Sequence, residues 1–99
     1  MRRNHEIAQL KADSRLDELV REHGIALRLR ESGDLIGLCP FHSGSSPTLA
    51  VSTEINFFQC FGCGAKGSPI DWVMETKGFG LGDAIAFLRA RLHRLDSFS

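Results

Sequence analysis

The sequence predicts an α+β fold in which helices at both ends of the chain flank a small antiparallel β-sheet. Apolar residues recur at helical spacing in the first 24 residues and again in the last third, whereas apolar and polar residues alternate between these regions. The predicted sheet also contains two short pairs of cysteine and histidine residues at spacings typical of metal ligands. A metal ion bound by both pairs would join the ends of a β-ribbon.

Two helical segments are predicted before the sheet. Asp13 or Ser14 is expected to cap the second helix, and Gly24 suits the position just after its end. The apolar stripe of that helix consists of Leu16, Leu19 and Val20, at positions i, i+3 and i+4. The segment before it, which contains Ile7 and Leu10, predicts a shorter helix.

Alternation with a period of two predicts four strands, which span residues 27–30, 36–38, 48–52 and 55–60. A turn over residues 31–34 joins the first two. The side facing the core is expected to carry Leu27, Leu29, Ile36, Leu38, Leu49 and Val51. The opposite side is expected to carry Arg28, Arg30, Gly37, Thr48, Ala50 and Ser52.

Two helices are predicted after the sheet. Ser68 is a good N-cap, Pro69 a good first helical residue, and Gly78 a good terminator of the third helix. A last helix begins near Gly82, and its apolar stripe is expected to pack over one face of the sheet.

The metal-binding prediction depends on four residues. Cys39 and His42 form a Cys-x2-His pair, Cys60 and Cys63 form a Cys-x2-Cys pair, and seventeen residues separate the two pairs. Three thiolates and one imidazole complete a closed tetrahedron, which is typical of one structural Zn²⁺ and leaves no position for a substrate. The alternative is that the cysteines are small buried hydrophobes or part of a disulfide framework, to which an odd cysteine count is poorly suited.

Length and composition indicate one small domain over residues 1–99, with a core at about 5–93 and a ragged tail over 94–99. No apolar run is long enough for a membrane span or a signal peptide, so we expect a cytoplasmic protein without a membrane partner. The formal net charge is zero. Binding of nucleic acid through bulk electrostatics is therefore not expected, and any such binding would come from a local patch.

A candidate patch lies on the side of the sheet facing away from the core. Phe57 and Phe58 are neighbours in one strand and point to opposite sides, so one of them is exposed unless a helix covers it. An exposed ring beside Arg28 and Arg30 would form a stacking platform for single-stranded bases, with the arginines on phosphates. Lys66, next to the second ligand pair, would reach phosphate or remain a solvated surface charge.

The segments LCPFHSGSSPTLAV and NFFQCFGCGAKGSPIDWVM resemble the N-terminal zinc-binding domain of bacterial and phage DNA primases. The resemblance covers roughly residues 5–92. It implies a zinc ribbon whose ligands are Cys39, His42, Cys60 and Cys63. It also implies a module that binds the single-stranded DNA template and works with a primase polymerase domain or a replicative helicase.

Catalysis by this chain alone is not expected, because the family's polymerase domain uses an Asp-x-Asp pair and the sequence contains none. The chain is either the first domain of a longer primase or a free-standing protein. Two hypotheses of function remain. The first is a template-binding module used in primer synthesis; the second is a zinc ribbon that docks on a protein of a replication complex or mobile element. The neutral charge and the serine-rich loop 43–47 favour the second hypothesis, and the arginines beside an aromatic residue favour the first.

Overall fold

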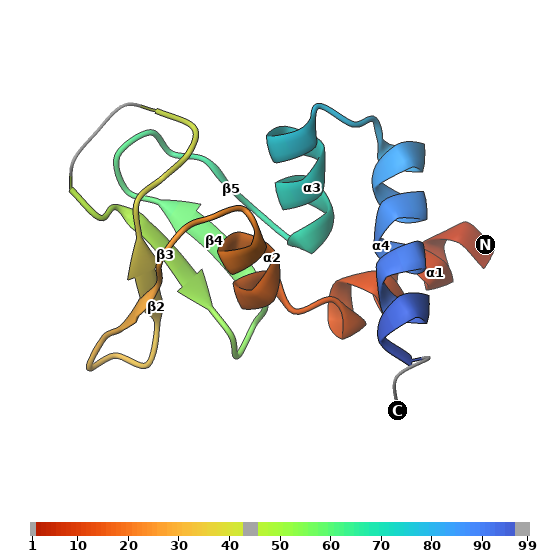
Figure 1. The fold of residues 1–99 in the computed structure, drawn as a ribbon, viewed down its shortest axis with the longest axis horizontal. Helices are drawn as coiled ribbons and strands as arrows, with labels where there is room; N and C mark the ends of the chain where they lie inside the picture. The colour runs from red at the N-terminus through yellow and green to blue at the C-terminus, as the bar shows by residue number, and fades with distance from the viewer. Residues whose placement is uncertain (1, 43–45, 97–99) are drawn as a thin grey trace.

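The computed structural model describes residues 2–42 and 46–96 and has the predicted α+β fold, with the sheet at one end of the molecule (Figure 1). The helices of this part are α1 (Arg2–Asp13), α2 (Leu16–Glu22), α3 (Pro69–Lys77) and α4 (Leu81–Asp96). Its strands are β1 (Arg28–Leu29), β2 (Leu35–Gly37), β3 (Leu49–Ser52), β4 (Phe57–Cys60) and β5 (Lys66–Gly67). Most of the serine-rich loop, residues 43–45, lies outside the described residues.

The five strands form one antiparallel sheet in the order β1-β2-β3-β4-β5. Helix α2 packs against β3 and α3 against β5, so one face of the sheet is covered by helices and is called the inner face here (Figure 1). The opposite face is called the outer face. Because directly paired residues share a face, the register assigns one row of residues to the outer face. That row consists of Arg28, Ile36, Ala50, Gln59 and Lys66.

The predicted orientation of β2 is wrong by one residue. Leu35 pairs with Val51, and Gly37 pairs with Leu49, so Leu35 and Gly37 face the core. Ile36 lies on the outer face, and Leu38 beyond the strand is 49% exposed. A Cβ at Gly37 would lie 2.7 Å from the carbonyl oxygen of Ala26, so the backbone of the segment between α2 and β1 occupies the space that a side chain would need.

Other elements also differ in extent from the prediction. The strand predicted over 27–30 has two paired residues, and the strand predicted from residue 55 begins at Phe57, after a turn over 53–56. The short strand β5 was not predicted. Helix α4 continues to Asp96, so residues 94–96 are helical and not part of a ragged tail; residues 97–99 lie outside the described part.

Helix α4 does not pack over the sheet as predicted. It packs chiefly against α1 and α3, on the side of the molecule away from the strands (Figure 1). Its buried residues are Ala84, Ile85, Leu88 and Arg91. Leu81, the first residue of the helix, is 40% exposed. No helix among the described residues is long and apolar enough to cross a membrane.

The predicted boundaries of α3 are confirmed. Ser68 forms a capping box with Asp71, whose carboxylate accepts a hydrogen bond from the Ser68 backbone N–H at 2.8 Å. Pro69 occupies the first turn, where a missing N–H has no consequence. Gly78 ends the helix in the left-handed conformation, with φ of 69°. The cap at Ser68 fixes the direction in which the chain passes from β5 into α3.

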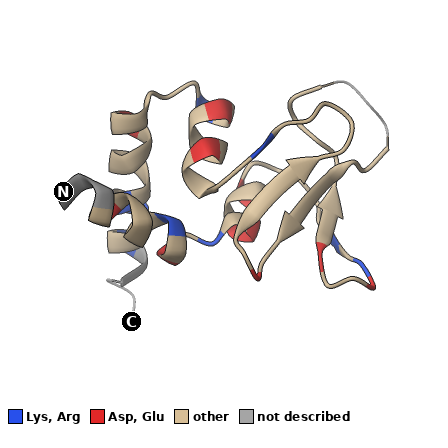
Figure 2. Ribbon diagram, turned by 180° about the vertical axis from the view of Figure 1, so that it is seen from behind, with Lys and Arg blue, Asp and Glu red and all other residues tan. Residues whose placement is uncertain are grey.

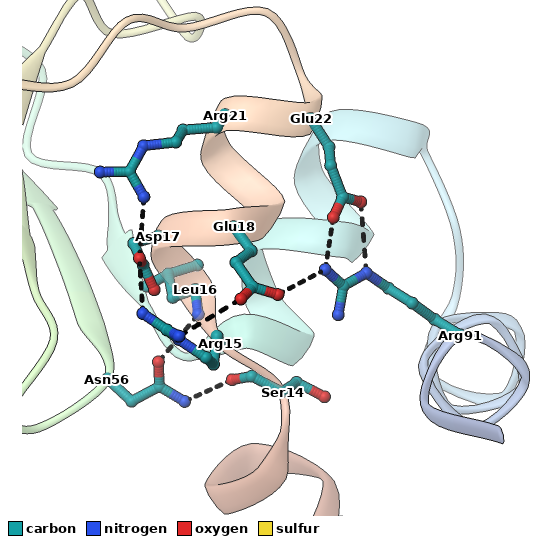
Figure 3. A network of polar contacts seen from close by, with 9 residues as sticks. All are labelled: Ser14, Arg15, Leu16, Asp17, Glu18, Arg21, Glu22, Asn56 and Arg91. Atoms are coloured by element: carbon teal, nitrogen blue, oxygen red, sulfur yellow. Dashed lines mark hydrogen bonds and ion pairs between the residues drawn. The ribbon is translucent and has the colours of Figure 1, made fainter. Parts of the chain in front are cut away.

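Helix α2 begins differently from the prediction, because neither Asp13 nor Ser14 caps it. The N-cap is Arg15, which makes no side-chain cap, and the buried Ser14 hydroxyl has no hydrogen-bond partner in the part of the chain that the structure describes. The side chain of Asn56, from the turn between β3 and β4, caps the helix instead (Figure 3). Its Oδ1 accepts the Leu16 N–H at 2.9 Å, and its Nδ2 donates to the carbonyls of Lys11 and Ser14, both at 2.6 Å.

We expect Asn56→Ala to lower the free energy of unfolding by about 2–3 kcal/mol, because three hydrogen bonds worth roughly 0.5–1.5 kcal/mol each are lost. Asn56 also has φ of 56°, which alanine adopts poorly. Asn56→Gly is the matched control, since glycine removes the backbone strain and loses the same bonds. Urea unfolding of both variants measures the two contributions separately. A wild-type midpoint for Asn56→Gly would show that the hydrogen bonds contribute little.

A second polar link joins α2 to α4. The Arg91 guanidinium contacts Glu18 at 3.2 Å and forms a two-pronged contact with Glu22 (Figure 3). Hydrogen bonding to Glu22 raises the pKa of Arg91, against the opposing effect of burial. The side chain of Arg91 is 10% exposed, so these carboxylates satisfy a cation that helix packing has taken out of water.

The core connects the sheet to the helices through aromatic rings. Phe58 and Trp72 are 1% and 2% exposed, and their ring centroids lie 5.2 Å apart in an edge-to-face arrangement. Phe41 completes the cluster at 5.5 Å from Trp72 and 6.0 Å from Phe58. Because Phe41 lies between Cys39 and His42, the first ligand pair is packed directly onto the core. Trp72 therefore packs in the interior.

Candidate metal centre and sheet surface

The two ligand pairs are brought together by the ends of two central strands. Cys39 and His42 follow β2, while Cys60 is the last residue of β4 and Cys63 lies in the turn to β5. That turn is closed by hydrogen bonds from the Cys60 N–H to the Ala65 carbonyl at 2.7 Å and from the Gly64 N–H to the Cys60 carbonyl at 3.0 Å. The ligand-bearing segments therefore meet at one end of the sheet.

The geometry of the four donors fits one tetrahedral zinc ion. Single donor atoms from all four residues lie within 4.8 Å of one another. The sulfurs of Cys39 and Cys63 are 3.8 Å apart, which is the edge of about 3.8 Å expected for a tetrahedron with Zn–S distances of about 2.3 Å. The His42 Nε2 lies 3.3 Å from the Cys60 sulfur. None of the three cysteines forms a disulfide.

Hydrogen-bond donors surround the Cys60 sulfur. The backbone N–H groups of Gly62 and Cys63 donate to it at 3.3 and 3.4 Å, and the Thr48 hydroxyl lies 3.2 Å away. Burial opposes the thiolate, but these hydrogen bonds outweigh it and lower the pKa of Cys60 to about 5. Burial raises the pKa of the Cys39 thiol to about 12. A bound dication would hold every ligating thiol as thiolate.

Two glycines shape the second ligand pair for different reasons. Gly64 has φ of +82°, a conformation that favours glycine and turns the chain back towards β5. A Cβ at Gly62 would instead lie 2.8 Å from the His42 Nε2. The absent side chain therefore leaves room for the imidazole beside the Cys60 sulfur.

The outer face of the sheet carries most of the residues predicted to contact nucleic acid. Arg28 and Lys66 stand at opposite ends of its cross-strand row, and both are exposed. Four strand spacings of about 4.8 Å put these ends about 19 Å apart. Figure 2 shows this side. The central strands are free of charged residues, and the blue of lysine and arginine appears at β5 and in the β1–β2 turn. Arg30 is exposed beside that turn, where its N–H donates to the Asp34 carbonyl at 2.8 Å.

The two neighbouring phenylalanines separate as expected. Phe57 pairs with Ser52 and lies half-buried on the outer face, whereas Phe58 pairs with Val51 and lies in the core. A stacking role for Phe58 would require the core to open, so only Phe57 is available. The prediction missed Phe61, whose side chain is 64% exposed. The alternation of Phe57, Gln59 and Phe61 along the sequence places Phe61 on the side of Phe57, but its position between two metal ligands favoured a role in the turn.

Comparison with known proteins identifies relatives for almost the whole chain. Residues 2–97 match the family model described as CHC2 zinc finger. The DNA primase of Synechococcus elongatus is 42% identical over 69 residues, which are 70% of this chain and 10% of that primase. The DNA primase of Clostridium acetobutylicum is 34% identical over 79 residues, which are 79% of this chain and 13% of that primase.

A solved structure shows the same arrangement. The crystal structure of the Aquifex aeolicus primase, with its zinc-binding and RNA polymerase domains, superimposes with a TM-score of 0.79 and 28% identity. The match covers 87% of this chain and 21% of that chain. This chain therefore spans a small part of the length of the proteins that it matches.

Proposed function

This chain belongs to the CHC2 zinc finger family of DNA primase zinc-binding domains, and on that premise we propose that it is a template-binding module used in primer synthesis. In this proposal Cys39, His42, Cys60 and Cys63 hold one structural zinc ion. The outer face of the sheet binds single-stranded DNA. The module forms one domain, acts in the cytoplasm, and works beside a primase polymerase domain and a replicative helicase.

The observation that carries the proposal is the composition of the outer face. It has a cation at each edge, Arg28 and Lys66, and an aromatic column of Phe57 in β4 and Phe61 directly after it. Single-strand binding needs cations that follow the backbone and rings on which bases stack. The helices leave this face uncovered (Figure 1). With so few cations, the proposed binding is weak and depends only modestly on salt.

The zinc ion supplies structure and not chemistry in this proposal. Four protein donors fill a tetrahedral zinc, so no coordination position remains for water or substrate. The ligand pairs fix the strand ends that present the outer face, and Phe41 ties the first pair to the core. We propose that nucleotidyl transfer belongs to the polymerase domain. The absence of an Asp-x-Asp pair from the sequence supports this division.

We expect short single-stranded DNA to bind with micromolar affinity at low salt. Two or three phosphate contacts, each contributing about −0.7, give a slope of log K against log salt of about −1.5 to −2. Arg28→Ala/Lys66→Ala should bind at least about tenfold more weakly and reduce the slope to about −0.7, because only Arg30 remains. Fluorescence anisotropy with a labelled oligonucleotide measures both quantities.

The matched control is Lys11→Ala/Lys77→Ala, which removes the same charge from exposed positions on α1 and α3. It should bind like the wild type. If both double variants weaken binding equally, general electrostatics explains the affinity and the outer face is not the site. No binding by the wild type at low salt would favour the second candidate function.

The second candidate is docking on a partner protein. A hollow of about 530 Å³ lies at the β1 edge, where Ile25, Leu38, Pro40 and Pro47 contribute apolar surface. Leu29 in the edge strand is 74% exposed. Such a surface suits a protein of the replication complex, for example the polymerase domain. Leu29→Asp would weaken that association and leave DNA binding unchanged.

A further inference from the structure

A small hollow on the outer face combines aromatic and polar groups. Its volume is about 220 Å³, and its lining includes Asp34, Ala50, Ser52, Phe57, Gln59 and Phe61. We call it the base hollow. It is smaller than the roughly 300–1,000 Å³ of pockets that hold complete small-molecule ligands. A single flat ring system is the kind of group that it accommodates.

Strand register explains how the hollow forms. Phe57, Gln59 and Phe61 alternate along β4 and its extension, so their side chains project to one side about 6.8 Å apart. On the neighbouring strand, Ala50 pairs with Gln59, and Ser52 pairs with Phe57. These small residues form a low floor between the taller side chains of β4 and those of β2. The two phenyl rings stand at opposite ends of this floor.

The polar wall of the hollow is built around Asp34. Because Leu35 pairs with Val51, Asp34 comes next to Ser52 at the start of β2. Asp34 is half-buried, and no ion pair to it is found within residues 2–42 and 46–96. A carboxylate only accepts hydrogen bonds, while the Gln59 amide and the Ser52 hydroxyl both donate and accept. The hollow therefore offers Asp34, which acts only as an acceptor, beside Ser52 and Gln59, which can act as donor or acceptor.

We propose that the base hollow takes one unstacked base of the template and that Asp34 makes it prefer guanine. This inference rests on the proposed function. Single-stranded bases are recognised by stacking on aromatic rings and by hydrogen bonds to their Watson–Crick edges. Guanine presents two adjacent donors there, N1–H and the N2 amino group, which match the two oxygens of a carboxylate. Thymine has one N–H between two carbonyl oxygens, which a carboxylate repels.

The test uses four labelled heptanucleotides that consist of thymidine except for the central base, which is dG, dA, dC or dT. Their affinities for the zinc-loaded chain are measured by anisotropy at one salt concentration. We expect the dG oligonucleotide to bind about 5- to 10-fold more tightly than the dT oligonucleotide, which is the lower end of the discrimination that a good base contact provides. Equal binding of all four would overturn this inference and leave the proposed function standing.

Two variants separate base selection from stacking. In Asp34→Asn the side chain offers a donor as well as an acceptor, so the preference for dG should fall below about twofold while binding persists. Asp83→Asn, at the start of α4, removes the same charge and should keep the preference. Phe61→Ala should weaken all four oligonucleotides about 5- to 150-fold.

Two results would contradict the inference directly: a preference for dG that survives in Asp34→Asn, or one that Asp83→Asn also abolishes. Binding of none of the four oligonucleotides by the wild type would overturn the proposed function as well. Folding of Phe61→Ala is not in question, because the ring is mostly exposed.

Discussion

We expect Cys60→Ser to lose cooperative folding. Zinc binding supplies on the order of 10–16 kcal/mol in zinc-finger peptides at neutral pH, whereas an entire small domain is stable by about 5–15 kcal/mol. Cys60 is fully buried, and two backbone N–H groups and the Thr48 hydroxyl surround its sulfur. Loss of this ligand would therefore free the ends of β2 and β4 together.

Trp72 provides the readout for this prediction, because it is the only tryptophan and it is buried against Phe41 and Phe58. Chelation of the wild type should shift its fluorescence as the Cys60→Ser substitution does, and thermal unfolding should become broad. His93→Ala is the control, since this exposed histidine on α4 lies outside the metal centre. Metal analysis without stoichiometric zinc, or a Cys60→Ser variant that unfolds like the wild type, would refute the structural role of the metal.

The second large effect distinguishes the two neighbouring phenylalanines. Phe58→Ala should destabilise the fold by about 3–5 kcal/mol, as expected for deletion of a fully buried ring. Phe57→Ala should cost only about 1 kcal/mol, because its ring is half-buried on the outer face, but it should weaken single-stranded DNA binding. Urea unfolding and anisotropy on both variants test this. Equal destabilisation by the two substitutions would contradict the assignment of faces.

Local signals in the sequence predicted the parts of the fold that depend on local chemistry. The capping residues of α3 were recognisable because Ser68, Pro69 and Gly78 act on their own helix. The grouping of Cys39, His42, Cys60 and Cys63 was recognisable because each pair needs only a short turn. The alternation around Phe57 and Phe58 correctly placed one on each side of the sheet but did not indicate which one helices cover.

Features that depend on distant contacts were not predictable in this way. Asn56 caps α2 from forty residues away, and nothing near Leu16 in the sequence indicates that partner. Which residues of β2 face the core depends on the close approach of the Ala26 backbone to Gly37. The packing of α4 depends on its contact with α1. Strand β5 has only two residues, too few for a periodic pattern. The exposure of Phe61 was not predicted, because a residue between two metal ligands is expected to form part of the turn.

The most direct test of template binding on the outer face is an amide NMR titration of the zinc-loaded chain with a short single-stranded oligonucleotide. Binding there predicts that the largest shift changes occur at Arg28, Gln59, Phe61 and Lys66, with small changes at buried Val73 and Leu88. Changes confined to α1 and α4, or to the apolar hollow beside Leu38, would contradict it. So would a spectrum that does not change at low salt.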